Sequence, residues 1–189
     1  GISLGVAAII VVMSVMNGFR SNLIERLIGV NSHINIYSIN EKIEIEEIIK
    51  IQKQLDSKNY KALYSSIETQ GLIINNNTSK GVILRAYDKI STDHYLYKRT
   101  ITKKNSKIGF DKIIIGDALA KELNLKIGDQ IKIAIPKTDK TIFGNIPRFK
   151  TLKIAGIFSL GMYEYDSNFI FSNVSIANKL ILIEDSSFN

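Results

Sequence analysis

Glu164 and Asp166, in the segment GMYEYDS, are the two carboxylates whose spacing best suits acid–base chemistry. Residues two apart on a strand share a face, so the two side chains would form a carboxylate pair there. No nucleophile or metal ligand stands beside them in the sequence, and a polar edge or hydrogen-bonding turn is the favoured interpretation. We therefore expect both residues to serve structure and not proton transfer.

The remaining residue types exclude several kinds of site. The chain has two histidines, His33 and His94, and no cysteine, which excludes a thiolate metal site and a disulfide framework. Neither histidine has a ligand set nearby in sequence. The motifs G-x-x-x-x-G-K-[ST], G-x-G-x-x-G, H-E-x-x-H and G-x-S-x-G are all absent. We expect no catalytic residue, no metal and no cofactor.

The positive charge is concentrated in the middle of the chain. The net charge is +7, and residues 95–153 alone carry fourteen Lys or Arg against five Asp or Glu. A localised basic region is typical of a surface for an acidic partner, a membrane or a nucleic acid. An ordinary lysine-rich surface is the alternative. Stacking aromatics beside cations, as nucleic-acid binding requires, occur only weakly, in YLYKR at residues 95–99.

The N-terminal segment predicts a membrane helix. Residues 1–19, GISLGVAAIIVVMSVMNGF, carry no charge. At ~1.5 Å per residue they nearly cross a bilayer core, which takes ~20 residues. A signal peptide fits poorly because no basic region precedes the apolar run, and a buried soluble helix fits poorly because the apolarity is uniform. We interpret the segment as the distal part of a transmembrane helix and expect the natural chain to extend upstream.

The rest of the chain mixes strands, helices and hairpins, which indicates an α+β fold. The predicted helices begin after Asn40, at Asp117 as capping residue, and near Val174. Alternation and β-branched runs predict the strands, namely His33–Ile39, Tyr60–Glu68, Gly71–Asn76, Ser79–Asp88, Ile113–Ile115, Asp129–Ile135, Thr151–Phe158 and Ser167–Asn173.

One connection between predicted strands is unusually long. It contains the only two prolines, Pro136 and Pro147, and between them the run Ile142-Phe143-Gly144. A hairpin normally turns in about two to five residues, and this segment is more than twice that length. Prolines stiffen the two arms and discourage edge pairing. Exposed apolar residues can fill a partner's pocket and lysines can steer an acidic partner; a mobile loop is the alternative.

Three stretches together resemble the LolC/LolE membrane subunits of the lipoprotein-releasing ABC transporter. They are GVAAIIVVMSVMNGF, IIIGDALAKELNLKIGDQIKIAIP and AGIFSLGMYEYDSNFIF, and the similarity covers nearly the whole chain. The resemblance implies a MacB-like periplasmic domain of two small α+β subdomains, one inserted in the other. It implies the end of the first transmembrane helix and its extension in residues 1–30, and the periplasmic domain, truncated at its C-terminal end, in residues 31–189.

The function implied by this resemblance is that of a non-catalytic inner-membrane subunit of a Gram-negative bacterium. Such a subunit contacts membrane lipid, extracts lipoproteins and passes them to a periplasmic carrier, LolA, while a separate ATPase subunit hydrolyses ATP. A second membrane subunit completes the transporter, as a homo- or heterodimer. A MacB-like efflux subunit or an FtsX-like signalling subunit is the alternative, and a basic nucleic-acid-binding domain is a remote one.

The resemblance also implies a site. LolC-type subunits grip the carrier with a long hairpin, the hook, which corresponds to residues 136–150 here, assisted by a polar patch, the pad, at Lys132, Phe149 and Lys150. Met16 matches a position that contacts the lipoprotein. A proline expected near the hook tip is not evident. The implied carrier-binding residues are Lys132, Pro136, Lys137, Lys140, Thr141, Ile142, Phe143, Gly144, Asn145, Ile146, Pro147, Arg148, Phe149 and Lys150.

Overall fold

The chain forms two compact units, Gly1–Ile36 and Tyr37–Asn189, in the computed structural model. Each unit is described by itself. The structure describes residues 1–37, 43–55, 60, 63–75, 78–88, 111–141, 144–181 and 187–188.

The first unit is dominated by one long helix, α1 (Ile2–Val30). The stretch Ile2–Ile24 is long and apolar enough to cross a membrane, and its side chains are not buried in the protein. A helix of 23 residues is ~35 Å long, against ~30 Å for a bilayer core. The predicted continuous apolar helix is confirmed. The predicted strand His33–Ile39 is wrong, because its described residues, 33–37, form no strand.

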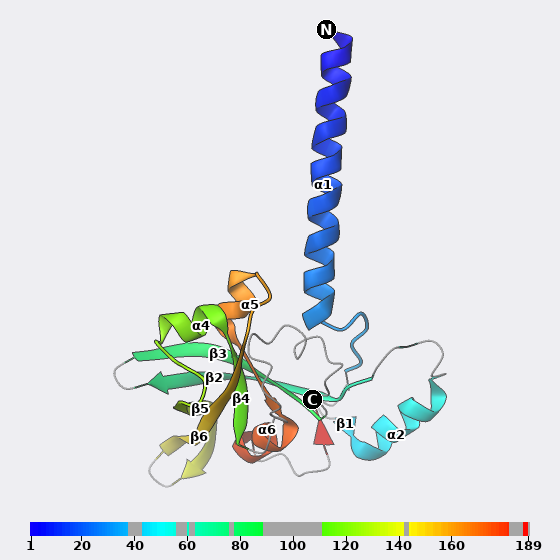
Figure 1. Cartoon of the computed structure of the whole chain (residues 1–189). Helices are drawn as coiled ribbons and strands as arrows, with labels where there is room; N and C mark the ends of the chain where they lie inside the picture. The colour runs from blue at the N-terminus through cyan, green and yellow to red at the C-terminus, as the bar shows by residue number, and fades with distance from the viewer. Residues whose placement is uncertain are drawn as a thin grey trace. The chain divides into compact units, whose positions relative to one another are not determined.

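The second unit is built around a closed six-stranded barrel (Figure 1). Its strands follow the order β2-β3-β7-β4-β6-β5, and β5 pairs with β2 to close the ring. Two neighbouring pairs, β3 with β7 and β4 with β6, are parallel. The strands are β2 (Ser66–Asn75), β3 (Thr78–Tyr87), β4 (Lys112–Gly116), β5 (Gln130–Thr141), β6 (Gly144–Phe158) and β7 (Phe169–Asn173).

The barrel interior is the main hydrophobic core. Alternate residues of each strand point inward, as the two-residue period requires. Helix α6 (Val174–Ile181) adds Ile176, Ala177 and Leu180 to this core and packs against strands on several sides of the ring. The predicted start of this helix near Val174 is confirmed. The inward strand residues include Ile67, Ile73, Leu84, Ile113, Ile115, Ile131, Ile133, Leu152, Ile154 and Ile170.

A second apolar layer lies on the outer side of strands β3, β7, β4 and β6. The Phe171 ring packs against Phe158, with centroids 5.0 Å apart, and against Tyr87 at 6.3 Å. All three side chains are buried, together with Ile114 and Leu160. Strands β4 and β7 are therefore covered on both faces, which explains why Ile113–Ile115 and Phe169–Phe171 are continuously apolar and do not alternate with polar residues.

Helix α4 (Asp117–Glu122) connects β4 to β5, and its capping differs from the prediction. Gly116 and not Asp117 is the N-cap, and no side chain caps the helix; Asp117 instead pairs with Lys121 at 2.6 Å. At the other end Asn124 adopts a left-handed φ of 50°. The Leu125 N–H donates to the Ala120 carbonyl at 2.8 Å, which completes a Schellman motif.

Other boundaries also differ from the prediction. The expected separate strands Tyr60–Glu68 and Gly71–Asn76 are one strand, β2. Helix α2 (Ile45–Gln54) begins five residues after Asn40, which lies outside the described residues, so the predicted cap is wrong. A two-residue strand, β1 (Ile43–Glu44), precedes the helix and pairs with β8 (Ser187–Phe188). The α+β class is confirmed; the division into two subdomains stays a prediction.

The close approach of Gly116 to helix α5 (Tyr163–Asn168) gives a test of this packing. A Cβ at Gly116 would lie 2.0 Å from the backbone oxygen of Asp166. Gly116→Ala is therefore expected to lower the free energy of unfolding by about 3 kcal/mol or more, because backbone must move. The measurement is urea unfolding in detergent micelles, followed by circular dichroism.

Gly81→Ala is the matched control, since a Cβ there meets nothing within 4 Å. Replacing this strand glycine is expected to be neutral or to stabilise by about 0.5–1 kcal/mol, because alanine loses less backbone freedom on folding. Equal stability of the two variants would contradict the described packing of β4 against α5.

Candidate protein-binding site on the β5–β6 arm

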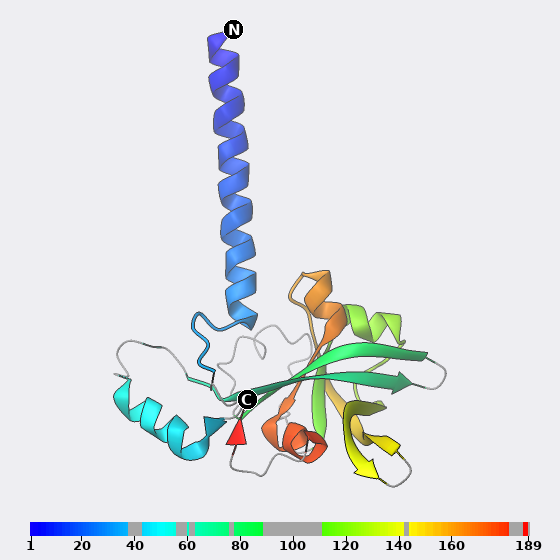
Figure 2. The same ribbon diagram turned by 180° about the vertical axis from the view of Figure 1, so that it is seen from behind.

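Strands β5 and β6 continue as a hairpin beyond the barrel, drawn largely in yellow in Figure 2. We call residues 136–148 the arm. Its ladder pairs Asp139 with Ile146, Lys140 with Asn145 and Thr141 with Gly144. The connection is therefore two residues long. The predicted strand ends, Ile135 and Thr151, are wrong because the ladder continues past them, and the described residues form the implied hairpin instead of the alternative, a mobile loop. The tip residues Ile142 and Phe143 lie outside the described residues.

Both prolines lie in an irregularity of this ladder. Ile135 pairs with Arg148, and the next pair is Asp139 with Ile146. Three residues of β5, 136–138, thus face one residue of β6, Pro147. Proline has no N–H to donate, so it is tolerated in a sheet at bulges and edges. A bulge bends the strand that carries it and increases its twist. The bulge therefore lies between the regular ladder that ends at Ile135 and Arg148 and the outer part of the arm.

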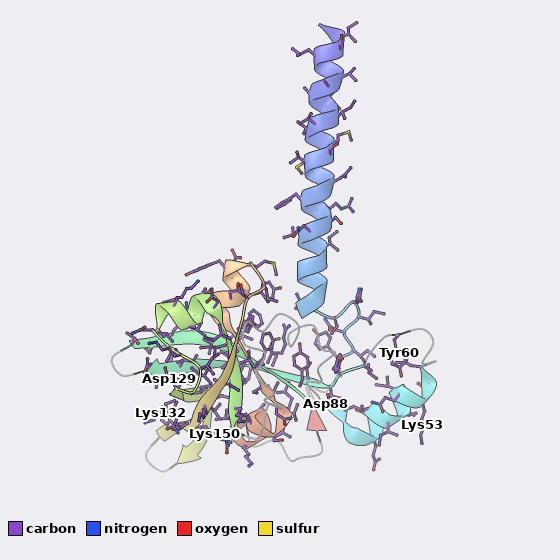
Figure 3. The ribbon with its side chains drawn as sticks, in the orientation of Figure 1. Lys53, Tyr60, Asp88, Asp129, Lys132 and Lys150 are labelled. Atoms are coloured by element: carbon purple, nitrogen blue, oxygen red, sulfur yellow. The ribbon has the colours of Figure 1, made fainter. Side chains whose placement is uncertain are left out.

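The base of the arm brings two predicted site residues onto one face. Ala134 is the direct partner of Phe149, and Lys132 is two residues from Ala134 on β5. Lys132 and Phe149 are therefore diagonal neighbours on the outer face of the barrel, where both are exposed. Figure 3 labels Lys132 and Lys150 on the two strands.

Lys150 is separated from that face. Lys150 follows Phe149 on β6, so its side chain points to the opposite face of the strand, the face that carries the buried Leu152 and Ile154. Its side chain is only 19% exposed, and its Nζ lies 3.4 Å from Oδ1 of Asp111. Thr151, the direct partner of Lys132, is exposed on the outer face instead. Thr151 was not among the predicted site residues. The two-residue period of β6 could have indicated it, because Thr151 and Phe149 share one face of the strand.

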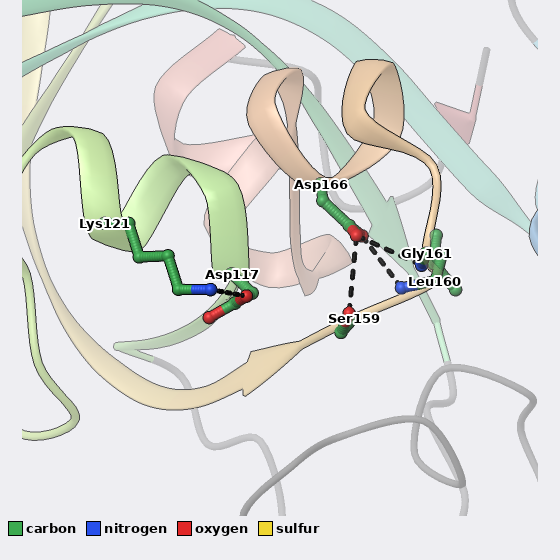
Figure 4. A network of polar contacts seen from close by, with 6 residues as sticks. All are labelled: Asp117, Lys121, Ser159, Leu160, Gly161 and Asp166. Carbon is green, nitrogen blue, oxygen red and sulfur yellow. Dashed lines mark hydrogen bonds and ion pairs between the residues drawn. The ribbon is translucent and has the colours of Figure 1, made fainter.

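Glu164 and Asp166 do not form a carboxylate pair, as Figure 4 shows for Asp166. They lie on helix α5 and not on a strand, and residues two apart on a helix do not face each other. Asp166 is buried and accepts hydrogen bonds from the N–H groups of Leu160 at 2.9 Å and Gly161 at 3.2 Å. The Ser159 hydroxyl donates to it at 3.4 Å. Asp166 therefore fixes the turn before α5, while Glu164 is exposed.

The other titratable groups can be placed only where the structure describes the chain. Among the described residues no three His, Asp or Glu side chains gather in a way that holds a metal ion. His33 is exposed, and His94 lies outside the described residues. Burial raises the pKa of Tyr87, partly offset by Arg85, so its phenol stays protonated at neutral pH. Met16 is exposed on α1.

Arg85 is occupied by structural contacts next to this tyrosine. It binds its cross-strand partner Glu68 at 2.7 Å. Its guanidinium also lies over the Phe169 ring, 5.0 Å from the centroid, in a cation–π contact. These contacts hold the outer aromatic layer against β2 and β3.

Comparison with known proteins matches residues 1–185 to the family described as MacB-like periplasmic core domain. The chain belongs to this family. A solved structure has a similar fold: the extracellular domain of the noncanonic ABC-type transporter YknZ from Gram-positive bacteria. It matches with a TM-score of 0.50 and 11% sequence identity, and the match covers 78% of this chain and 73% of that one.

Curated relatives include lipoprotein-releasing system transmembrane proteins. LolC of Neisseria meningitidis is 29% identical over 189 aligned positions, which cover 97% of this chain and 45% of the relative. LolC of Haemophilus influenzae is 28% identical over 97% of this chain and 46% of the relative. LolE of the same organism is 30% identical in a match that covers 71% of this chain and 34% of the relative. The chain spans about half the length of the LolC relatives, and the predicted LolC/LolE resemblance is confirmed.

The role of Asp166 can be tested against that of Glu164. Asp166→Asn keeps the shape but turns an amide donor toward backbone N–H groups. It is expected to lower the free energy of unfolding by about 1–3 kcal/mol. Glu164→Gln is the matched control, with an expected change within about 0.5 kcal/mol because the side chain is exposed. The measurement is thermal unfolding of both variants. Equal losses of stability would contradict the structural role of Asp166.

Proposed function

We propose that this chain is part of the membrane subunit of a lipoprotein-releasing ABC transporter. The family match, the LolC and LolE relatives and the apolar helix α1 support the proposal. In this role α1 is a transmembrane helix in the inner membrane of a Gram-negative bacterium, in contact with lipid, and the barrel unit lies in the periplasm. Residues 1–30 then belong to the helix and residues 31–189 to the periplasmic domain with its two subdomains.

The chemistry of transport is supplied elsewhere in the proposed complex. The sequence carries no phosphate-binding loop, in agreement with ATP hydrolysis by a separate ATPase subunit. A second membrane subunit, identical or different, completes the transporter. In this role Met16 on α1 contacts the lipoprotein's acyl region. This subunit acts by binding and conformational change, without a covalent step of its own.

The arm is the proposed contact for the periplasmic lipoprotein carrier. The observation that carries this assignment is the β5–β6 ladder, which continues past the barrel to Thr141 and Gly144. A paired ribbon is more preorganised than a loop, so less conformational entropy is lost on binding. Proline at the bulge leaves fewer donors for unwanted strand pairing. In this proposal Ile142 and Phe143, in the two-residue connection between the arm's strands, contact the carrier, and Lys137, Lys140 and Arg148 of the arm take part.

The relatives favour lipoprotein release over the alternatives in the same class. A MacB-like efflux subunit and an FtsX-like signalling subunit share the domain type, but the curated relatives described above are lipoprotein-releasing proteins. Lys150 forms an ion pair with Asp111. We therefore assign Lys150 a structural role in the barrel and do not expect it to steer the carrier during association. Lys132 and Phe149 remain in the proposed contact.

The tip can be tested by truncating one aromatic ring. Phe143→Ala is expected to weaken carrier binding by about 2 kcal/mol, roughly thirtyfold in Kd, because such rings act as interface anchors. The assay is calorimetric titration of the purified carrier into the chain in detergent micelles. Tyr163→Ala is the control, since Tyr163 is an exposed aromatic residue on α5, outside the arm. Equal affinities of the two variants would remove the tip from the interface.

Charge steering gives a separate kinetic test. Lys132→Glu is expected to slow association about three- to tenfold at low salt and to flatten the salt dependence, with a smaller effect on dissociation. Lys53→Glu, an exposed lysine of helix α2, is the matched control for the same change in net charge. The association rate constants of both variants are measured by stopped flow across a salt series. A similar loss in both variants would indicate a general charge effect and not steering at the arm.

A further inference from the structure

The turn before helix α5 presents an exposed aromatic side chain. Tyr163, the first residue of α5, is 68% exposed, and Met162 before it is partly exposed. We call these two residues the α5 tip. Neither belongs to the β5–β6 arm or to the barrel strands. Single exposed aromatic residues are ordinary on protein surfaces, so exposure alone assigns the tip no role.

The backbone on both sides of the α5 tip is held in place. On one side, the buried Asp166 carboxylate accepts hydrogen bonds from the N–H groups of Leu160 and Gly161, as Figure 4 shows. On the other side, the Met162 carbonyl accepts hydrogen bonds from the N–H groups of Tyr165 at 3.1 Å and Asp166 at 2.9 Å. Gly161 adopts a left-handed φ of 72°, which glycine reaches without strain. The tip is therefore preorganised.

Helix α5 is itself fixed to the barrel. The Tyr165 ring stacks on Phe169 of β7, with centroids 4.9 Å apart. The backbone of Asp166 lies so close to Gly116, at the end of β4, that no Cβ fits between them. Because the helix is held at both places, a contact made by Tyr163 also fixes the orientation of the barrel unit toward whatever the tip binds.

The surface charges around the α5 tip nearly cancel. On α4, which packs against α5, Asp117 pairs with Lys121, and Glu122 pairs with Lys80 of β3. Among the exposed residues of α5, Glu164 adds one negative charge. Attraction to an anionic membrane requires a cluster of Lys or Arg, which this surface does not have. A neutral or zwitterionic surface is the one that the tip can approach without an electrostatic cost.

The size of the α5 tip favours a lipid surface over a protein partner. A specific protein interface buries about 800 Å² on each side, whereas one tyrosine buries about 150–250 Å². A bilayer needs no matching pocket, and tyrosine is enriched at the membrane–water interface, where its ring contacts lipid and its hydroxyl stays hydrated. Burial of one such side chain favours the bound state on the order of tenfold to a hundredfold.

We propose that the α5 tip is a membrane-contact site, with Tyr163 and Met162 in the headgroup layer of a zwitterionic bilayer. This inference rests on one part of the proposed function, the placement of α1 in a membrane. Because α1 and the barrel unit belong to one chain, the tip stays near the bilayer at high effective concentration, and a weak contact is sufficient. The arm takes no part in this contact, so carrier affinity in micelles does not depend on Tyr163.

The experiment uses the absence of tryptophan from the 189-residue chain, so that one introduced tryptophan reports only on its own surroundings. Tyr163→Trp, Phe19→Trp and Phe149→Trp are each made in the full chain and reconstituted into phosphatidylcholine vesicles, with plain lipids or with lipids brominated close to the headgroup. Bromine quenches only tryptophan that contacts lipid. Phe19 on α1 is the control for membrane insertion, and Phe149 on β6 is the control for an exposed aromatic position elsewhere on the barrel.

Tyr163→Trp is expected to lose about half of its emission in brominated vesicles and to shift to the blue, whereas Phe149→Trp is expected to change little. Quenching of Phe19→Trp without quenching of Tyr163→Trp would overturn the α5 tip and leave the placement of α1 intact. No quenching of Phe19→Trp would contradict the membrane placement of α1 and the tip with it.

Two further outcomes would also show that the proposal is wrong. Equal quenching of Tyr163→Trp and Phe149→Trp would indicate unspecific adhesion of the barrel to lipid. A blue shift of Tyr163→Trp that grows with the ratio of chain to lipid, without quenching by bromine, would assign the α5 tip to contact with a second copy of the chain.

Discussion

The pairing of β2 with β5 is the contact on which the rest of the barrel unit depends. Only Leu72–Ile74 and Lys132–Ala134 take part in it. These three pairs bury Ile73 against Ile133 inside the ring and turn Leu72 and Lys132 to the outside. Since β5 also forms half of the arm, the same pairs set where the arm leaves the barrel. The hydrophobic core and the proposed binding surface are thus two faces of one short ladder.

Much of the fold was predictable where the signal is local. Three elements can be predicted from their own residues alone. They are the uncharged helix α1, the apolar strand Ile113–Ile115 and the amphipathic helix α6 that starts at Val174. The division of β2 has a local cause, whereas one pairing in the barrel has no local signal. Strand β2 was divided because the polar residues Thr69 and Gln70 interrupt its apolar pattern, but Gln70 points outward and costs nothing there. The pairing of β3 with the distant β7 has no local signal at all.

The candidate site shows where sequence reasoning loses precision. Pro136 and Pro147 were expected to stiffen the two arms of a long connection, but nothing in the sequence indicated that both fall together in one bulge of a continuous ladder. Lys150 looked equivalent to Lys132 in charge, but a shift of one residue on a strand reverses the face. Asp166 was expected to serve structure, and its buried hydrogen bonds agree with that expectation. Its partners are backbone N–H groups, which only become visible once the turn before α5 is built.

The position of β7 has a consequence for how the domain is made. β7 inserts between β3 and β4, although it is the last of the six barrel strands in the chain. During synthesis the hairpins β2–β3 and β5–β6 are complete early, because their partners are neighbours in sequence. Until Asn173 emerges, however, β3 and β4 are open edges of an unfinished sheet, which is the condition that favours aggregation. The barrel therefore closes late, in a step with high contact order, after the strands of the arm have been made.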